Sequence, residues 1–134
     1  MVTACRLVLR ATQLDAKRCE TDIPADRRDW PPDVVAAADT LRHVAARTGR
    51  IDRYGYAETG IIEVALDEVW SAFVAFVPWA YDATVWNADA ADIVSLADEG
   101  QSIVARVTPE QYGAIVAELG DRRLVPEHEW RRVR

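Results

Sequence analysis

Cysteine is scarce in this sequence, and its placement suggests no chemistry. Cys5 and Cys19 are the only two cysteines in 134 residues, and their spacing matches neither a redox pair nor a metal-binding knuckle. We interpret them as reduced thiols with Cys5 facing the core, and a disulfide between them is the alternative. Because nothing else resembles a cofactor motif, we expect no cofactor.

Histidine is equally scarce, which narrows the choice of general bases and metal ligands. His43 lies four residues from both Asp39 and Arg47, so it is expected on the charged, solvent-facing side of a helix. His128 stands between two glutamates, at positions 127 and 129, but consecutive residues do not converge on one ion. Asn87, Asp89 and Asp92 depart from the spacing of a calcium loop. We therefore expect no metal site.

Long hydrophobic runs are also missing. The longest apolar stretch, residues 69–80, is shorter than the roughly 20 residues that a membrane span needs, and it contains Pro78. The first residues show neither a basic region nor the apolar region of a secretory signal. We expect a protein without membrane association, located in the cytoplasm.

Catalytic fingerprints are missing as well. Gly55 and Gly60 stand alone, so the sequence has no glycine-rich phosphate loop, and it has no nucleophile elbow. Two pairs of adjacent carboxylates occur, at positions 67–68 and 98–99. A helix start explains the first pair and a turn explains the second. We therefore predict no catalytic residue, although paired carboxylates leave acid/base chemistry open as an alternative.

The composition is that of one ordinary globular domain, spanning residues 1–134. Half of the residues are apolar and 28% are charged. The net charge of −6 is concentrated in residues 50–99, where two basic residues stand against ten acidic ones. Such a field repels nucleic acid and attracts basic partners. We therefore expect a basic protein partner and no nucleic-acid binding.

Three helices are predicted, near residues 32–48, 67–77 and 108–119. The first begins after a pair of prolines and repeats its apolar residues at helical spacing. The second follows Asp67, a good N-cap, and is apolar almost all round, with an alternating strand over 69–77 as the alternative. The third has Thr108 and Gln111 placed for a capping box, with a proline in its first turn.

Strands account for most of the remainder. Residues 5–12 alternate between apolar and basic positions, which predicts a half-exposed strand. Residues 61–66, 83–86, 93–97 and 102–107 are further β-type runs, the last two joined by a hairpin turn that contains Gly100. A polar connector is expected near 15–31, and a short C-terminal tail at 121–134. Together they predict an α+β fold: a mainly antiparallel sheet of about five strands packed by three helices.

The remaining signal is a set of aromatic residues among carboxylates. Aromatic side chains beside acidic ones suit a docking surface for arginine or lysine side chains, whereas the competing interpretation is that these rings fill the core. The candidate partner-binding residues are Tyr54, Tyr56, Trp79, Tyr81, Asp82, Trp86, Asp89, Asp92, Asp98 and Glu99.

The function that we predict is an acidic binding module that docks onto a basic protein. Immunity-type and antitoxin-type inhibitors of bacterial competition systems often have this size and charge, so one of these is a possible identity by analogy of composition alone. Two alternatives stay open. One is a small hydrolase-like or ligand-binding enzyme that uses carboxylates near the aromatic segment. The other is a homo-oligomeric structural subunit.

Overall fold

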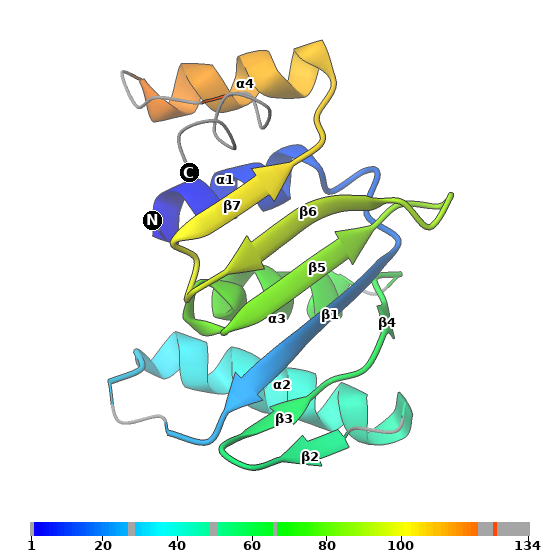
Figure 1. Cartoon of the computed structure of the whole chain (residues 1–134), viewed down its shortest axis with the longest axis vertical. Coiled ribbons are helices and arrows are strands. Elements are labelled where there is room, and N and C mark those ends of the chain that lie inside the picture. Colours follow the sequence, from blue (N-terminus) through cyan, green and yellow to red (C-terminus); the bar gives the residue numbers. More distant parts are fainter. Residues whose placement is uncertain (1, 27–28, 49–50, 66, 121–124, 126–134) are drawn as a thin grey trace.

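Helices and strands alternate along the chain in an α+β fold (Figure 1). The computed structural model describes residues 2–26, 29–48, 51–65, 67–120 and 125. The helices are α1 (Val2–Ala11), α2 (Pro32–Thr48), α3 (Asp67–Phe76) and α4 (Pro109–Leu119), with a short 3-10 helix, η1 (Val77–Trp79), after α3. The strands are β1 (Arg18–Pro24), β2 (Ile51–Arg53), β3 (Tyr56–Glu58), β4 (Ile62–Glu63), β5 (Asp82–Trp86), β6 (Asp92–Ala97) and β7 (Ser102–Ala105).

The strands form one antiparallel sheet in the order β2-β3-β1-β5-β6-β7, with β4 also pairing with β1. On one side, β1 pairs with β5. On its other side, it pairs with β4 at Arg18 and Cys19 and with β3 from Asp22 to Pro24. Thr59 lies between these two pairings, where its backbone and hydroxyl exchange hydrogen bonds with Thr21. The central strand is therefore held by two short partners on one side and a longer partner on the other.

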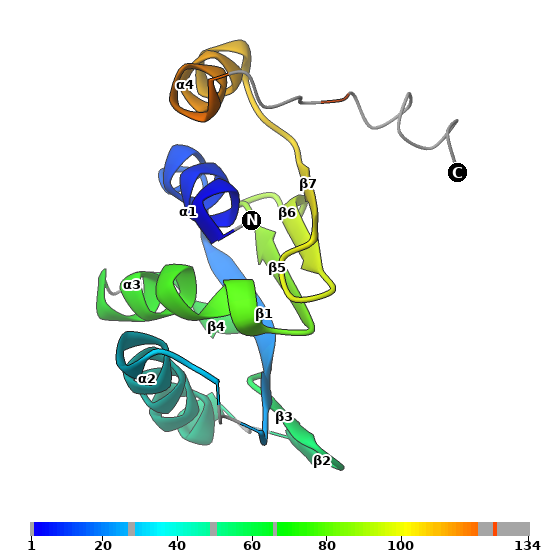
Figure 2. The same ribbon diagram turned by 90° about the vertical axis from the view of Figure 1, so that its left-hand side faces the viewer.

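The helices α1, α2 and α3 cover one face of the sheet, as Figure 2 shows from the side. Side chains that face the helices include Cys19, Ile23, Val85, Val94 and Leu96, all of which are buried. They pack with large buried residues of the helices, among them Leu9, Leu41, Phe73 and Phe76. The core therefore lies between the helices and one face of the sheet, and the other face is available for a different task.

The predicted mainly antiparallel sheet is confirmed, and so are the three predicted helices. Residues 69–76 are helical, which decides against the alternative strand. The capping box of α4 forms as expected: the Thr108 hydroxyl accepts from the backbone N–H of Gln111, and the Gln111 side chain accepts from the N–H of Thr108. Both cysteines are free thiols buried in the core, which decides against a disulfide.

Two parts of the prediction were wrong. Residues 5–12 were expected to form a strand, but residues 2–11 form the helix α1, whose buried positions Cys5, Val8 and Leu9 also fit helical spacing. The segment near 15–31 was expected to be a polar connector, but it contains β1, which pairs with the three strands β3, β4 and β5. Within the described residues, the sheet consequently has seven strands instead of about five, and there are four α-helices instead of three.

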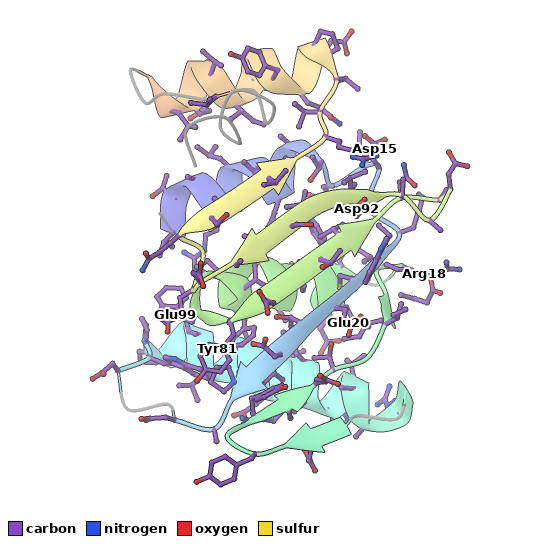
Figure 3. The ribbon with its side chains drawn as sticks, in the orientation of Figure 1. Asp15, Arg18, Glu20, Tyr81, Asp92 and Glu99 are labelled. Carbon is purple, nitrogen blue, oxygen red and sulfur yellow. The ribbon has the colours of Figure 1, made fainter. Side chains whose placement is uncertain are left out.

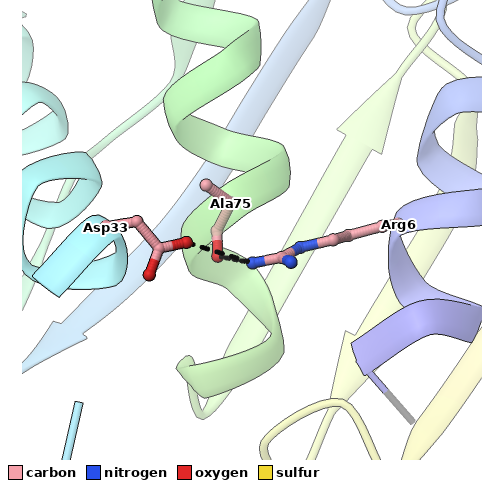
Figure 4. A network of polar contacts seen from close by, with 3 residues as sticks. All are labelled: Arg6, Asp33 and Ala75. Atoms are coloured by element: carbon pink, nitrogen blue, oxygen red, sulfur yellow. Dashed lines mark hydrogen bonds and ion pairs between the residues drawn. The ribbon is translucent and has the colours of Figure 1, made fainter. Parts of the chain in front are cut away.

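Arg6 ties three helices together on the covered side of the sheet (Figure 4). Its guanidinium donates to the carbonyl of Ala75 at the end of α3, 3.0 Å away, and lies 4.0 Å from the carboxylate of Asp33 at the start of α2. It also lies over the ring of Trp79, 5.8 Å from the centroid. A cation at a helix C-terminus interacts favourably with the helix dipole, so Arg6 joins α1 to both neighbouring helices.

The turn between β6 and β7 has an unusual backbone. Asp98, Glu99 and Gly100 all have positive φ, at 54°, 56° and 75°. A side chain at position 100 would place a Cβ 2.8 Å from the sulfur of Cys5. Glycine is therefore required here for two reasons, the left-handed conformation and the close approach of the turn to α1.

No helix in the described part of the chain is both long enough and apolar enough to cross a membrane.

Candidate functional site: an acidic hollow on the open face of the sheet

The face of the sheet opposite α1, α2 and α3 is here called the open face. Alternation along the strands and the register between them decide which side chains lie on it. In β1, Cys19 and Thr21 point toward the helices, so Glu20 points the other way. Glu20 is paired with Thr84 of β5, and paired residues share a face. Asp82 lies two residues from Thr84 and therefore lies on the open face too.

The same rule places carboxylates from three strands next to one another. Asp22 of β1 is paired with Glu58 of β3, and both follow the open-face alternation. With Glu20 and Asp82 they surround a shallow hollow of about 440 Å³, whose edge is formed by Tyr56 and Tyr81. We call this region the acidic hollow. Its four carboxylates come from β1, β3 and β5, so no single sequence segment contains it.

Asp22 is the buried member of this group, with 8% of its surface exposed. Its two carboxylate oxygens accept separate hydrogen bonds, one from the backbone N–H of Tyr81 at 2.8 Å and one from that of Asp82 at 3.0 Å. Burial raises the pKa of Asp22, and the nearby carboxylates of Asp82 and Glu58 add to this, while the two backbone hydrogen bonds oppose it. Asp22 thus holds the start of β5 in place beside the hollow.

Glu20 and Asp82 have carboxylates with no hydrogen bond or ion pair to any described residue, and Asp82 is exposed. Unpaired carboxylates are common at a protein surface, where water solvates them. Here, however, they stand beside a third, buried carboxylate that cannot move away. The result is a local negative field that a cation entering the hollow would neutralise.

Two tyrosines form the aromatic edge of the acidic hollow. The rings of Tyr56 and Tyr81 meet edge to face, with centroids 6.2 Å apart and an interplanar angle of 87°. Tyr81 is 44% exposed, so part of its ring remains accessible. Aromatic faces and carboxylates together attract guanidinium and ammonium groups. The hollow therefore has the chemistry of a receptor for a basic side chain.

Among the side chains that the structure describes, that of Arg18 is the basic one on the open face near the hollow. Arg18 of β1 is paired with Glu63 of β4, and the guanidinium Nε lies 3.0 Å from the carboxylate Oε1. In Figure 3, Arg18 and Glu20 extend from the same strand, with Arg18 toward the β4 side. Because Glu63 already neutralises Arg18, this arginine does little to reduce the negative charge around Glu20 and Asp82.

Three of the predicted partner-binding residues come together at the acidic hollow: Tyr56, Tyr81 and Asp82. Asp98 and Glu99 lie at the same end of the sheet, because they follow Ala97, which is paired with Asp82. Figure 3 shows Glu99 and Tyr81 at that end.

The other predicted residues lie elsewhere. Trp79 contacts Arg6 on the helical side of the sheet, and Tyr54 is fully exposed at the tip of the turn between β2 and β3. Trp86 is half-buried at the far end of β5, where a bulge pairs it with Asp92. The candidate residues between positions 79 and 92 are therefore divided between the two faces of the sheet and its two ends.

A second hollow, of about 510 Å³, lies at the opposite end of the sheet. Lys17, Asp89, Ile93 and Arg106 are among its lining residues. Arg106 lies 3.8 Å from the carboxylate of Asp92. Charges of both signs line this hollow, so it lacks the single-sign field of the acidic hollow.

Metal binding receives no support within the described residues, where no group of three or more histidines, cysteines, aspartates or glutamates is placed to hold an ion. His43 is exposed and lies 3.2 Å from Arg47, as expected for a surface histidine. The expected solvated residues Glu127, His128 and Glu129 lie outside the described residues.

Glu20, Asp22 and Glu58 are the members of the hollow that sequence reasoning missed. A signal for the first two existed: Cys19, Thr21 and Ile23 alternate with polar residues, which is the pattern of a half-covered strand.

No protein-family model matches this chain, and neither the curated proteins nor the solved structures contain a match.

Proposed function

We propose that this protein is a binding module that docks onto a basic protein through the open face of its sheet, with the acidic hollow at the centre of the contact. The observation that supports this most is the pair of unpartnered carboxylates, Glu20 and Asp82, beside the buried Asp22 and the accessible ring of Tyr81. A basic side chain of the partner would enter the hollow, and the surrounding field would speed the encounter.

An immunity-type or antitoxin-type inhibitor is the kind of binding module that we favour. Such a protein acts by occluding a cationic surface on its target, and an open, acidic sheet face is a suitable shape for that task. A rigid sheet also keeps the carboxylates in place before binding, which lowers the entropic cost of association. The proposed role needs no catalytic group in this chain.

The test begins with a photo-reactive amino acid at Thr84, on the open face, and a matched one at Ala36, exposed on α2. A partner cross-linked from Thr84 and not from Ala36 is then purified, and its association rate is measured over a range of salt concentrations. We expect the rate to fall steeply as salt rises, because screening weakens the attraction.

Charge variants decide whether the hollow causes this steering. The double variant Glu20→Gln/Asp82→Asn should slow association and flatten its salt dependence. A control variant, Glu68→Gln/Asp89→Asn, removes the same charge from α3 and from the β5–β6 loop and should keep most of the dependence. Equal salt dependence in wild type and both variants would contradict the proposal.

A small-molecule or enzymatic role is the second candidate, and one observation favours it. The acidic hollow is within the size range of ligand sites, and it contains a buried carboxylate whose pKa is raised. Both oxygens of Asp22, however, are engaged by backbone N–H groups, so Glu20 and Asp82 would have to carry the chemistry. A cationic ligand that raises the melting temperature of the wild type but not of Asp82→Asn would support this role.

A homo-oligomeric role remains the third. Two exposed rings of the candidate set, Tyr54 and Tyr81, lie on different turns instead of forming one patch. Sedimentation equilibrium at high concentration tests this role directly, and a monomer would exclude it.

A further inference from the structure

The chain itself contains a basic segment of a kind that the acidic hollow would attract. Residues 121–134 include five arginines, three acidic residues and Trp130, and they lie outside the described residues apart from Val125. We propose that this C-terminal segment binds the acidic hollow of its own chain and competes there with the basic partner. The inference rests on the docking face proposed above and adds a means of regulating it.

Charge complementarity is the first support. The hollow offers the unpaired carboxylates of Glu20 and Asp82 and the accessible ring of Tyr81. Arginine forms paired hydrogen bonds to carboxylates and stacks on aromatic rings, so it satisfies both kinds of group at once. The segment has its arginines in two clusters, at positions 122–123 and 131–134. The second cluster, 11 to 14 residues beyond Gly120, has the length of chain needed to supply the guanidinium.

Reach is the second support. Fourteen residues span up to about 46 Å when extended. The row of paired residues Val104, Ser95, Thr84 and Glu20 crosses only three strand spacings from the edge strand β7 to the hollow, or roughly 14 Å. In Figure 1, α4 runs back against the direction of β7, and a helix of its length is only about 17 Å long. The segment that follows Gly120 can therefore reach the hollow.

A tethered competitor has a strong effect even when its contacts are weak. A short linker gives an effective concentration on the order of millimolar, so modest affinity is enough to occupy the hollow most of the time. If the segment occupied it for about nine-tenths of the time, the apparent affinity for a partner would fall about tenfold. The segment would then reject weakly bound basic proteins and admit a tightly bound one.

The test uses the full chain with a nitroxide label at Val133→Cys. Cys5 and Cys19 are fully buried and should not take the label. We expect the label to broaden the amide signals of open-face residues such as Thr84 and Ser95 at low salt, and the broadening to weaken as salt rises. Broadening that is absent, or that is confined to the amides of α2 and α3, would overturn the inference.

Two sets of variants make the result specific. In Glu20→Gln/Asp82→Asn the broadening should be lost, whereas Glu68→Gln/Asp89→Asn should retain it. If Glu20→Gln/Asp82→Asn folds poorly, the variant Arg131→Gln/Arg132→Gln replaces it, because those changes lie outside the described residues. Broadening that is unchanged in this second variant would also overturn the inference.

The experiment needs no partner, so the two proposals can fail separately. If the broadening is absent while a basic partner still associates with a steep salt dependence, the docking function stands without this regulation. If the broadening is present but no basic partner binds the open face, the hollow serves the chain's own segment and the docking function fails.

Discussion

Replacing Asp22 tests how the acidic hollow is held together. Its carboxylate accepts two backbone hydrogen bonds, from Tyr81 and Asp82, and the residue as a whole is 8% exposed. Asp22→Ala leaves both N–H groups without this acceptor, and each such loss costs about 1–2 kcal/mol where water can partly replace it. We expect a decrease of roughly 2–4 kcal/mol in the free energy of unfolding. Asp22→Asn keeps one acceptor oxygen, so its decrease should be about half as large.

The pH dependence of stability separates the charge of Asp22 from its hydrogen bonds. Burial raises the pKa of this carboxyl above its usual 3.8, so the folded state holds the proton more tightly than the unfolded state does. The stability that this proton provides is complete below the unfolded pKa and is lost as pH rises through the folded pKa. Asp22→Asn cannot titrate, so its deficit relative to wild type should shrink as pH rises above 4.

Urea unfolding at several pH values between 4 and 8 measures both effects, provided that the m-value is the same in all three proteins. The hydrogen-bond argument would be refuted if Asp22→Asn had a free energy of unfolding at pH 7 equal to or above that of the wild type. Removal of the buried charge would then outweigh the loss of the acceptor. Parallel pH curves for wild type and Asp22→Asn would refute the raised pKa.

Three further predictions concern the rest of the fold. Gly100→Ala should lower the free energy of unfolding by at least about 1 kcal/mol, because residue 100 has a positive φ and its new Cβ would meet Cys5. Gly113→Ala, in the open interior of α4, should instead raise the free energy of unfolding by about 0.5–1 kcal/mol. Urea unfolding of the two variants and the wild type measures both changes. Thr108→Ala should cost about 1 kcal/mol and speed amide exchange in α4, and unchanged exchange would contradict the role of the cap. Cys5 and Cys19 should resist a thiol reagent at pH 8 until the protein is unfolded, since burial raises both thiol pKa values, that of Cys19 to about 12.

The sequence predicted elements best where local signals agreed. The helix α4 has a cap, a proline in its first turn and an apolar face in one short stretch, so its limits could be predicted almost to the residue. Where the spacing of the apolar residues fits a strand and a helix equally well, the prediction was wrong. Residues 5–12 alternate like a strand, but Cys5, Val8 and Leu9 also fall on one side of a helix. Packing of α1 against the rest of the core decided the outcome, and a single sequence does not contain that information.

The acidic hollow was only partly predictable, for a different reason. Tyr81 and Asp82 stood out because rings and carboxylates lie next to each other in the sequence. Glu20 and Glu58 belong to distant segments, and they approach Asp82 only through the strand order β3-β1-β5. Strand order depends on long-range pairing that local propensity does not determine. Of the candidate partner-binding residues, therefore, only Tyr56, Tyr81 and Asp82 come together at the hollow.

The position of β1 in the sheet accounts for the acidic hollow. A central strand in a sheet covered on both faces has few polar side chains, because neither face meets water. In β1, Glu20 and Asp22 alternate with buried residues, which is suitable only for a sheet with one open face. On the side away from β5, β1 has two short partners, and Thr59 fills the space between them. The carboxylates thus lie where β3 leaves the sheet, and the two backbone hydrogen bonds of Asp22 hold the start of β5 beside them. A surface patch of mobile acidic side chains would not need such a buried anchor, so the arrangement supports our proposal of a docking face on this side of the sheet.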